Sequence, residues 1–355
     1  MKKVIILIVL MFTCFSDHLV LASSQKQKEP IRGIYVKASN TNGPQFNKLL
    51  NLVDQTDLNA MVIDIKDDHG NLTFIPAKNS PYYAASQPYI KNPKALIQKL
   101  KKHQIYPIAR IVVFKDNVLA QAHPDWSFQT SKGIWKNSRG DSFTNPFRTE
   151  VWDYNIGMAI EAVNLGFKEI QFDYVRFPEK FETLEKPLSY MGKKEGSNRV
   201  AAVTSFVQYA REKLYPYKVK MSVDTFGNAT VIPEAPGIGQ NFSKIAEHVD
   251  VISAMIYPSH WTGNFGIAKP DLEPYRLVEE YAKVEKARLK LLASPPTSRP
   301  WLQDFTATWL GKGNYKVYGK QEIEDQIRAL HAQGIQEFLL WNAANNYTAN
   351  VDYTP

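Results

Sequence analysis

The sequence is almost without cysteine. One of its 355 residues is a cysteine, Cys14, and it lies in the first segment of the chain without the small residues that precede a lipid-modified cysteine. Because we expect this segment to be removed, the mature chain would contain no thiol. That excludes disulfides, thiolate metal sites and cysteine nucleophiles. The fold must then be held by its core, and 44% hydrophobic and 22% charged residues can supply a large one.

A hydrophobic run of roughly 20 residues, the length needed to cross a bilayer, is also missing. The first segment instead begins with Lys2 and Lys3, continues with about a dozen mostly apolar residues and ends in small residues at 22–24. This order is typical of a secretory signal peptide, here residues 1–24, which a linker at 25–31 follows. We therefore expect a secreted or cell-envelope protein with no membrane span after cleavage. An uncleaved anchor is the alternative.

Dense runs of one charge are absent too. No five basic residues follow one another, and basic and acidic residues are interleaved along most expected helices. The formal net charge is nevertheless +8, of which Lys2, Lys3 and Asp17 account for +1, so the mature chain carries +7. For an exported protein this charge favours attraction to an anionic envelope polymer, and nucleic acid is not an expected partner. We expect a monomer without a cofactor.

What the sequence does contain is a regular alternation of apolar strand-like runs and helical segments. The eight expected strands are residues 31–39, 60–68, 106–116, 169–177, 218–227, 249–258, 299–305 and 336–343. The expected helices are residues 46–54, 93–103, 150–164, 200–214, 273–287 and 320–333. This alternation implies parallel pairing, and eight units in about 320 residues predict a single-domain α/β fold, the (β/α)8 or TIM barrel.

The barrel would span residues 32–347, with a C-terminal tail at 348–355. The helix that usually follows the eighth strand is missing from the pattern, and residues 25–30 are a candidate for covering that side of the barrel. A doubly wound open sheet is the alternative fold. No G-x-G-x-x-G turn follows the first strand, which argues against a dinucleotide-binding version of it.

Two loops interrupt the alternation. Residues 117–149 follow the third strand and carry Trp126, Phe128, Trp135 and Phe143 among polar residues and glycines. Residues 177–198 follow the fourth strand and are rich in charge. Because both come after the carboxyl end of a strand, we expect them to form the rim of the active face.

Carboxylates stand at the ends of two successive expected strands. Asp173 ends the fourth strand and Asp224 the fifth, and the strand period of two turns both toward the barrel interior. Neighbouring strands lie about 4.8 Å apart, which brings two such carboxylates into the range that glycoside hydrolysis uses, about 5 to 9 Å. Asp304 at the end of the seventh strand is a third candidate, although by parity either Gln303 or Asp304 faces the barrel.

Acetal cleavage needs one carboxylate that stays ionised and one that holds a proton for the leaving oxygen. Arg176 and Arg110 are candidates for keeping Asp173 ionised, so we assign it the nucleophile or charge-stabilising role. Phe226, and Tyr257 of the sixth strand, are expected to give Asp224 apolar surroundings, which favour a raised pKa and the acid/base role, with Asp304 as the alternative. A helix cap or turn explains a lone strand-end aspartate equally well.

The second strand ends in the polar run DIKDDHGN at 64–71. Asp64 and Lys66 share one parity and could lie beneath a sugar and bind its hydroxyls, whereas a plain Asp/Gly/Asn turn is the structural alternative. Asp67, Asp68 and His69 could instead hold a metal ion in a deacetylase-like enzyme. No H-x-H or H-x-x-x-H pair accompanies them among the seven histidines, so we expect no metal.

Aromatic and polar residues at strand ends suggest sugar subsites, because aromatic faces stack on the apolar faces of sugar rings. Any single one of them could equally be a core residue. The candidate substrate-binding residues are Asp64, Lys66, Arg110, Tyr174, Arg176, Tyr257, His260, Trp261, Trp301, Gln303, Trp341 and Asn342.

Eight motifs together resemble a glycoside-hydrolase-like domain family of bacterial exported proteins, a TIM-barrel family distantly similar to the α-amylase clan. They are RGIYVKAS, VIDIKDD, YPIARIVVFKD, QFDYVRFP, SVDTFG, ISAMIYPSHW, RPWLQDF and FLLWNA, and the resemblance covers the chain from about Arg32 to Asn346. The resemblance implies a barrel that acts on glycans, with Asp173 at the strand-four nucleophile position. The amylase-like enzymes usually carry Glu on the fifth strand, where this chain has Asp224. The sequence predicts a glycosidase, and the alternatives are a non-catalytic glycan-binding barrel and a metal-dependent deacetylase-like enzyme.

Overall fold

The computed structural model describes residues 29–191 and 198–355. The chain divides into Met1–Pro30, of which only the last two residues are described, and the compact unit Ile31–Pro355. The expected signal peptide at 1–24 and most of the segment proposed to cover the barrel, 25–30, lie outside the described residues. Within the described ranges, no helix combines the length and the hydrophobicity that crossing a bilayer requires.

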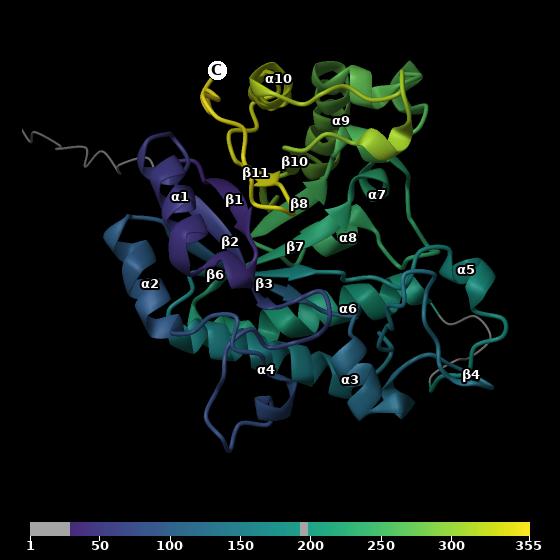
Figure 1. Ribbon diagram of the computed structural model, residues 1–355. Helices are drawn as coiled ribbons and strands as arrows, with labels where there is room; N and C mark the ends of the chain where they lie inside the picture. Colours follow the sequence, from purple (N-terminus) through teal and green to yellow (C-terminus); the bar gives the residue numbers. More distant parts are fainter. Residues whose placement is uncertain (1–28, 192–197) are drawn as a thin grey trace, which may run out of the picture. The chain divides into compact units, whose positions relative to one another are not determined.

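Eight parallel strands close into a barrel in the unit Ile31–Pro355 (Figure 1). In barrel order they are β1 (Arg32–Val36), β2 (Ala60–Lys66), β3 (Tyr106–Val112), β6 (Glu169–Asp173), β7 (Lys220–Phe226), β8 (Val251–Met255), β10 (Trp301–Gln303) and β11 (Phe338–Trp341). The ring closes because β11 pairs with β1 and β10 pairs with β8 through Trp301 and Met255. The predicted (β/α)8 barrel is confirmed.

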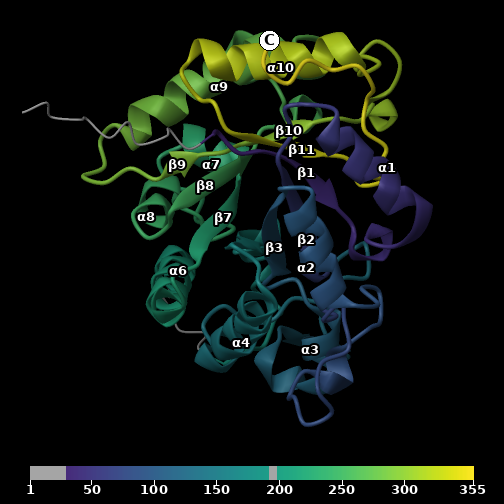
Figure 2. The same cartoon turned by 90° about the vertical axis from the view of Figure 1, so that its left-hand side faces the viewer.

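Helices surround these strands (Figures 1 and 2). The long ones are α1 (Gly43–Asp54), α2 (Pro93–Lys102), α4 (Thr149–Leu165), α6 (Arg199–Leu214), α9 (Pro274–Leu289) and α10 (Lys320–Ala332). The short ones are α3 (Asn117–Ala122), α5 (Phe181–Leu184), α7 (Gly227–Val231) and α8 (Phe242–Ala246). Short extra strands are the hairpin of β4 (Gln129–Thr130) with β5 (Gly133–Ile134), and β9 (Thr297–Ser298), which precedes β10 and pairs with β8.

Local sequence signals explain where the helices begin and end. The Asn92 side chain accepts a hydrogen bond from Ala95 N at 3.0 Å before α2, and Asn198 accepts one from Ala201 N at 3.0 Å before α6. Each bond satisfies one of the backbone donors that a helix start leaves without a partner. Gly166, with φ of 114°, ends α4 in the left-handed conformation that glycine adopts without strain.

Side-chain alternation along the strands separates two hydrophobic layers. On β2, Met61, Ile63 and Ile65 belong to the large core between strands and helices, whereas Ala60 and Val62 belong to a smaller cluster inside the barrel. The barrel interior is therefore a packed core with large side chains, as in other closed barrels of eight strands. Its buried members are Ile31, Tyr35, Ala60, Val62, Ile108, Tyr257, Trp301 and Leu339.

The amino-terminal end of the barrel holds a buried ion cluster. Arg299, 1% exposed, donates to Glu169 Oε1 at 2.8 Å and to Glu337 Oε2 at 2.7 Å. Tyr106 Oη donates to Glu169 Oε2 at 3.3 Å. Each buried charge in this cluster therefore has an opposite charge within contact distance.

The chain after β11 contains no helix in residues 342–355, as the sequence predicts. This tail packs along α10 instead, with Val351 and Tyr353 buried and Asp352 N donating to Glu324 Oε1 at 2.8 Å (Figure 2). The C-terminal tail thus covers the side of the barrel next to α10.

Candidate active site

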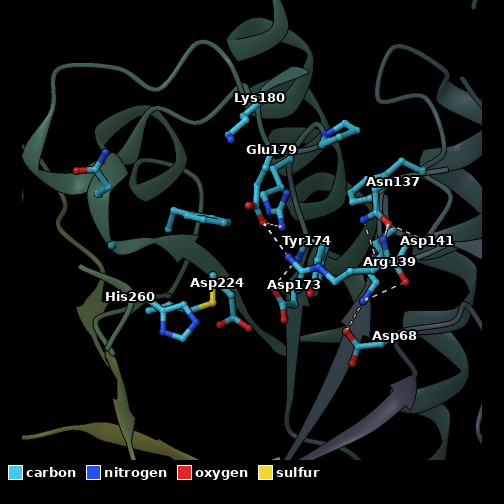
Figure 3. A pocket seen from close by; sticks show the side chains of 18 of the residues that line it. Asp68, Asn137, Arg139, Asp141, Asp173, Tyr174, Glu179, Lys180, Asp224 and His260 are labelled. Atoms are coloured by element: carbon cyan, nitrogen blue, oxygen red, sulfur yellow. Dashed lines mark hydrogen bonds and ion pairs between the residues drawn. The ribbon is translucent and has the colours of Figure 1, made fainter. Parts of the chain in front are cut away.

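A cavity of about 920 Å³ lies at the carboxyl ends of the barrel strands (Figure 3). The two long loops predicted as rims contribute to its wall, with Trp135 and Phe143 from the first and Glu179 and Lys180 from the second. The structure brings together ten of the residues selected from the sequence, namely Arg110, Asp173, Tyr174, Arg176, Asp224, Tyr257, His260, Trp261, Trp301 and Trp341.

Asp173 and Asp224 lie on neighbouring strands and end in this one cavity (Figure 3). Gln171 pairs with Ser222 and Phe172 pairs with Val223, so the next residues along β6 and β7 are the two aspartates. Adjacent strands are about 4.8 Å apart, and residues at matching positions point to the same face. The register therefore sets the two carboxylates next to each other on the interior side.

Asp173 is fixed by a bidentate contact with a buried guanidinium. Its Oδ2 accepts hydrogen bonds from Arg110 Nε at 2.9 Å and from Arg110 Nη2 at 2.6 Å. Its Oδ1 accepts one from the backbone N of Tyr174 at 2.6 Å. Charge-assisted bonds of this kind are short and strong, and they hold the carboxylate in one orientation.

Asp224 has a different environment, although it is the nearest acidic neighbour of Asp173 in the register. It is 2% exposed, and its Oδ1 accepts a hydrogen bond from Trp301 Nε1 at 2.8 Å. In residues 29–191 and 198–355 no cation forms an ion pair with it. Burial first, and then the negative charge of Asp173, raise the pKa of Asp224 well above its usual range. This carboxyl group is suited to hold a proton.

The guanidinium group of Arg110 forms ion pairs with three carboxylates at the cavity. Besides Asp173, its Nη1 donates to Asp64 Oδ1 at 2.7 Å and to Asp68 Oδ2 at 3.0 Å. Tyr35 Oη donates to the other oxygen of Asp64 at 2.5 Å. Burial raises the pKa of Asp64 to about 6, against the opposing charge of Arg110. Asp64 does not line the cavity, so it positions Arg110 and has no place to contact a sugar.

Tyr174 lines the cavity directly after Asp173. Its φ of 52° is unusual for a residue other than glycine, and it ends β6 at this point. Two cations contact the ring, with Lys115 Nζ and the guanidinium carbon of Arg176 each 4.8 Å from its centroid. This arrangement keeps the turn after β6 close to the reacting region of the cavity.

The β7–α7 turn depends on a glycine. A Cβ at Gly227 would lie 2.5 Å from the carbonyl oxygen of Met255 and 2.6 Å from a ring carbon of Trp261. Only a residue without a side chain lets this turn approach β8 so closely. Gly227 therefore shapes the cavity wall next to Asp224.

Lys66 is not in the cavity, contrary to its predicted contact with a sugar. The pairing of β2 with β3 shifts between Asp64 and Lys66, and this bulge turns the lysine toward α4. Its ammonium group is fully buried, donates to Asn155 Oδ1 at 2.7 Å and forms an ion pair with Asp116 Oδ2 at 2.6 Å. Lys66 therefore stabilises the layer between the barrel and α4.

The end of β10 likewise differs from the prediction. The carboxyl oxygens of Asp304 accept hydrogen bonds from Thr348 N at 3.1 Å and Thr348 Oγ1 at 2.7 Å, in the C-terminal tail. Asn342 donates to Asp304 O at 2.6 Å, and Gln303 donates to Asp271 Oδ1 at 3.0 Å. None of Gln303, Asp304 and Asn342 is among the residues of the cavity wall. They fasten loops and the tail to the barrel.

The acidic run after β2 does not converge on one point. Asp67 accepts bonds from His69 N at 2.9 Å and Asn71 N at 2.9 Å within its own turn. Asp68 turns the other way, toward Arg110 and Lys115. In the described part of the chain, no three His, Cys, Asp or Glu side chains are grouped as ligands of a metal ion. Residues 67–69 therefore lie in a turn, which is the structural alternative given for this run in the sequence analysis.

The aromatic residues form the floor and one side of the cavity. Trp341 stacks on Tyr35 with ring centroids 4.1 Å apart, and Trp301 meets Trp341 edge to face at 5.5 Å. Tyr257 contacts His260 at 5.4 Å on the side of β8. Burial lowers the pKa of His260, so its ring is neutral at pH 7.

Most of this chain matches a known protein family. Residues 33–347 match the family described as "Putative glycosyl hydrolase domain". The chain belongs to this glycosyl hydrolase-like family. No curated protein matches the chain.

Solved structures share the barrel of this family member. The glycoside hydrolase domain of PgaB (BpsB) from Bordetella bronchiseptica is 14% identical, with a TM-score of 0.61 over 89% of this chain and 95% of that one. The spore cortex-lytic enzyme SleL of Bacillus megaterium is 13% identical, with a TM-score of 0.52 over 91% and 72%. The α-galactosidase TtGalA of Thermus thermophilus is 12% identical, with a TM-score of 0.52 over 91% and 60%. At these identities the similarity shows the fold alone.

Several cavity residues of this glycosyl hydrolase-like chain were not selected from its sequence as sugar contacts. Asp68 and Lys115 form an ion pair of 3.3 Å at the cavity wall, and Glu179 and Lys180 come from the loop after β6. Lys115 follows β3 by a few residues, and Glu179 follows β6 by a few residues. Their positions after barrel strands are the sequence signal that could have identified them as cavity residues. Which loop residues turn inward depends on tertiary contacts, and no sequence period applies there.

Proposed function

We propose that this protein is a glycosidase that cleaves a polysaccharide or oligosaccharide with Asp173 and Asp224. The observation that carries the proposal is the contrast between the two adjacent carboxylates. Asp173 accepts two bonds from Arg110, whereas Asp224 is buried, accepts a bond from the indole N–H of Trp301 and has a raised pKa. Such a pair supplies one ionised and one protonated carboxyl group at neutral pH, as acetal cleavage requires.

In the proposed reaction, the ionised Asp173 attacks the anomeric carbon of the sugar. The bond from that carbon to the bridging oxygen breaks, and the proton of Asp224 moves to the leaving oxygen. Because Oδ1 of Asp224 accepts the Trp301 bond, Oδ2 is the oxygen that carries the proton. A water molecule then attacks the glycosyl–Asp173 ester and gives its proton to Asp224, which restores both groups.

The strand register favours this two-step route with retention of configuration. Retaining enzymes have carboxyl groups about 5 Å apart, whereas inverting enzymes leave about 6.5 to 9.5 Å for a water molecule. Matching positions on adjacent parallel strands lie at about the shorter separation. Proton NMR of the first sugar released would give its anomeric form, and inversion would contradict the assigned role of Asp173.

We also propose that the protein works outside the cytoplasm, secreted or in the cell envelope, as a monomer that an anionic envelope polymer attracts. The support is the signal-like segment at 1–24 and the charge of +7 that remains without it. Fractionation of cells that express the full chain tests the location, and protein retained in the cytoplasm at full length would contradict it.

The activity is tested by release of reducing ends from a panel of envelope and exopolysaccharide fractions. Asp173→Asn should lower turnover by about a thousandfold or more, because an amide is a poor nucleophile and does not stabilise positive charge. The melting temperature should stay near that of the wild type, since Arg110 keeps Asp64 and Asp68 as partners. Asp304→Asn should retain turnover. Full turnover in Asp173→Asn would overturn the proposal, and binding without turnover in the wild type would favour a glycan-binding barrel.

A further inference from the structure

A row of aromatic side chains leads out of the cavity on the side of β8 and β10. It begins at Tyr257, which lines the cavity and is 7% exposed, and ends at Trp309, which is 64% exposed. His260 and Phe305 lie between them. Figure 3 shows His260 facing the same space as Asp224.

The four rings contact one another continuously. Tyr257 lies 5.4 Å from His260 and 5.9 Å from Phe305 between ring centroids. Trp309 lies 6.2 Å from His260 and stacks on Phe305 at 5.9 Å with an interplanar angle of 25°. The row thus joins the cavity wall to the outer surface through contacts from ring to ring.

The exposed end of this row does not contribute to the core. Trp309 is in a short 3-10 helix, Thr308–Leu310, in the connection from β10 to α10. Other contacts hold this connection in place: Gln303 Nε2 donates to Phe305 O at 3.0 Å and Tyr318 N donates to Thr306 Oγ1 at 3.0 Å. Trp309 therefore presents an indole to solvent at the outer end of a row of rings that starts in the cavity, and Trp side chains placed in this way are common at binding sites.

We infer that Phe305 and Trp309, reached through His260, form an outer subsite on which a sugar unit of a glycan chain stacks while another part of the chain occupies the cavity. The occupant is a glycan because flat aromatic faces suit the apolar faces of sugar rings, and because the row continues the wall of the cavity that holds Asp173 and Asp224. The inference rests on the proposed glycosidase function and adds that the substrate is a chain that extends beyond the cavity.

The test is native electrophoresis in gels that contain soluble starch, hydroxyethyl cellulose or glycol chitin, three polymers of different sugar and linkage. In at least one gel the wild type should be retarded relative to a gel without polymer. Trp309→Ala should weaken that retention about two- to tenfold in apparent Kd, the range of one aromatic stacking contact. Trp309→Phe should recover most of it, because a ring remains at the site.

The matched control is Tyr215→Ala. Tyr215 is 76% exposed, follows α6 and precedes β7, so it lies at the other end of the barrel and should retain wild-type retardation. Equal retardation of Trp309→Ala and wild type, or no retardation of the wild type in any gel, would overturn the subsite. If the wild type migrates more slowly than Trp309→Ala even in a gel without polymer, the difference reflects self-association of the wild type. That result would also overturn the subsite.

Asp173→Asn separates this inference from the proposed reaction. If that variant is retarded like the wild type and Trp309→Ala is not, the subsite stands whether or not the protein hydrolyses the polymer. If the wild type hydrolyses a polymer and Trp309→Ala does so with an unchanged ratio of kcat/KM on polymer to kcat/KM on a trisaccharide of the same linkage, the subsite is absent while the glycosidase function stands.

Discussion

The two ends of the barrel both bury an arginine among carboxylates, and the carboxyl end also borders the cavity of the proposed reaction. At the amino end Arg299 contacts Glu169 and Glu337, and at the carboxyl end Arg110 contacts Asp64, Asp68 and Asp173. Both clusters satisfy their own charges. The carboxyl end differs in having Asp224, a buried carboxyl group that pairs with no cation among the described residues, in the wall of a cavity of about 920 Å³.

This difference separates two uses of buried charge. A complete ion cluster such as that of Arg299 fixes strand positions, and its charges have nothing left to offer a ligand. At the carboxyl end, a carboxylate bound by Arg110 lies next to Asp224, a buried carboxyl group whose pKa is raised. The functional signal is therefore the contrast between Asp173 and Asp224, and a buried ion pair alone does not provide it.

Among the tests of this contrast, Asp224→Asn should have the largest effect on turnover. Loss of a general acid lowers turnover by about 10² to 10⁴-fold, and the loss should shrink on aryl glycosides whose leaving group needs no proton. At neutral pH the variant should be more stable than the wild type, because folding raises the pKa of Asp224 and an amide needs no proton to be buried. Reducing-end release and thermal melting measure the two quantities. Equal loss on activated and unactivated substrates would contradict the acid role.

Removal of the buried arginine at the amino end of the barrel should lower the stability of the protein but leave its kcat unchanged. Arg299→Met leaves Glu169, which is fully buried, without its cation, and breaking a buried pair in this way destabilises by about 3 to 5 kcal/mol. Urea unfolding measures the free energy, and kcat per folded molecule should match the wild type. Glu337→Gln is the milder control because its side chain is 19% exposed. A strong loss of kcat in folded Arg299→Met would break the comparison.

The sequence predicts the fold and the two central carboxylates but not the whole site. Apolar strands alternating with helices predict the barrel, and the period of two along β6 and β7 selects Asp173 and Asp224. The same period fails at Lys66 because a bulge shifts the register between Asp64 and Lys66. At the end of β10 the period leaves Gln303 and Asp304 as alternatives, and the carboxyl group of Asp304 is bound by Thr348 in the tail. A contact across 44 residues of chain has no local signal.

Glu285 tests whether a raised pKa alone makes an active group. It lies on α9, fully buried, accepts from Ser298 Oγ at 2.9 Å, and burial raises its pKa to about 7. Because folding favours the protonated form, the wild type should lose stability relative to Glu285→Gln as pH rises from about 4.5 to about 7, by on the order of 3 kcal/mol. Urea unfolding of both proteins from pH 4 to pH 8 measures this difference.

The pH dependence of turnover should separate the two carboxyl groups. Glu285→Gln should leave the profile of kcat/KM unchanged, since α9 does not reach the cavity. The wild-type rate should fall on the alkaline side as Asp224 loses its proton, at a pH above the ordinary carboxyl range because its pKa is raised. An alkaline limb that moves in Glu285→Gln would show that stability, and not a catalytic proton, sets the profile.

The smallest expected effect comes from Asp68→Asn, which asks whether the third carboxylate on Arg110 belongs to the chemistry. Asp68 is 35% exposed and bonds Arg110 at 3.0 Å and Lys115 at 3.3 Å, so its contribution should be that of a partly solvated pair, about 1 kcal/mol or less. Arg110 keeps Asp64 and Asp173, and the orientation of Asp173 should survive. We therefore expect kcat/KM to fall about fivefold or less. A hundredfold fall in kcat with unchanged melting would instead place Asp68 in contact with the reacting sugar, and the division of roles would then involve three carboxyl groups.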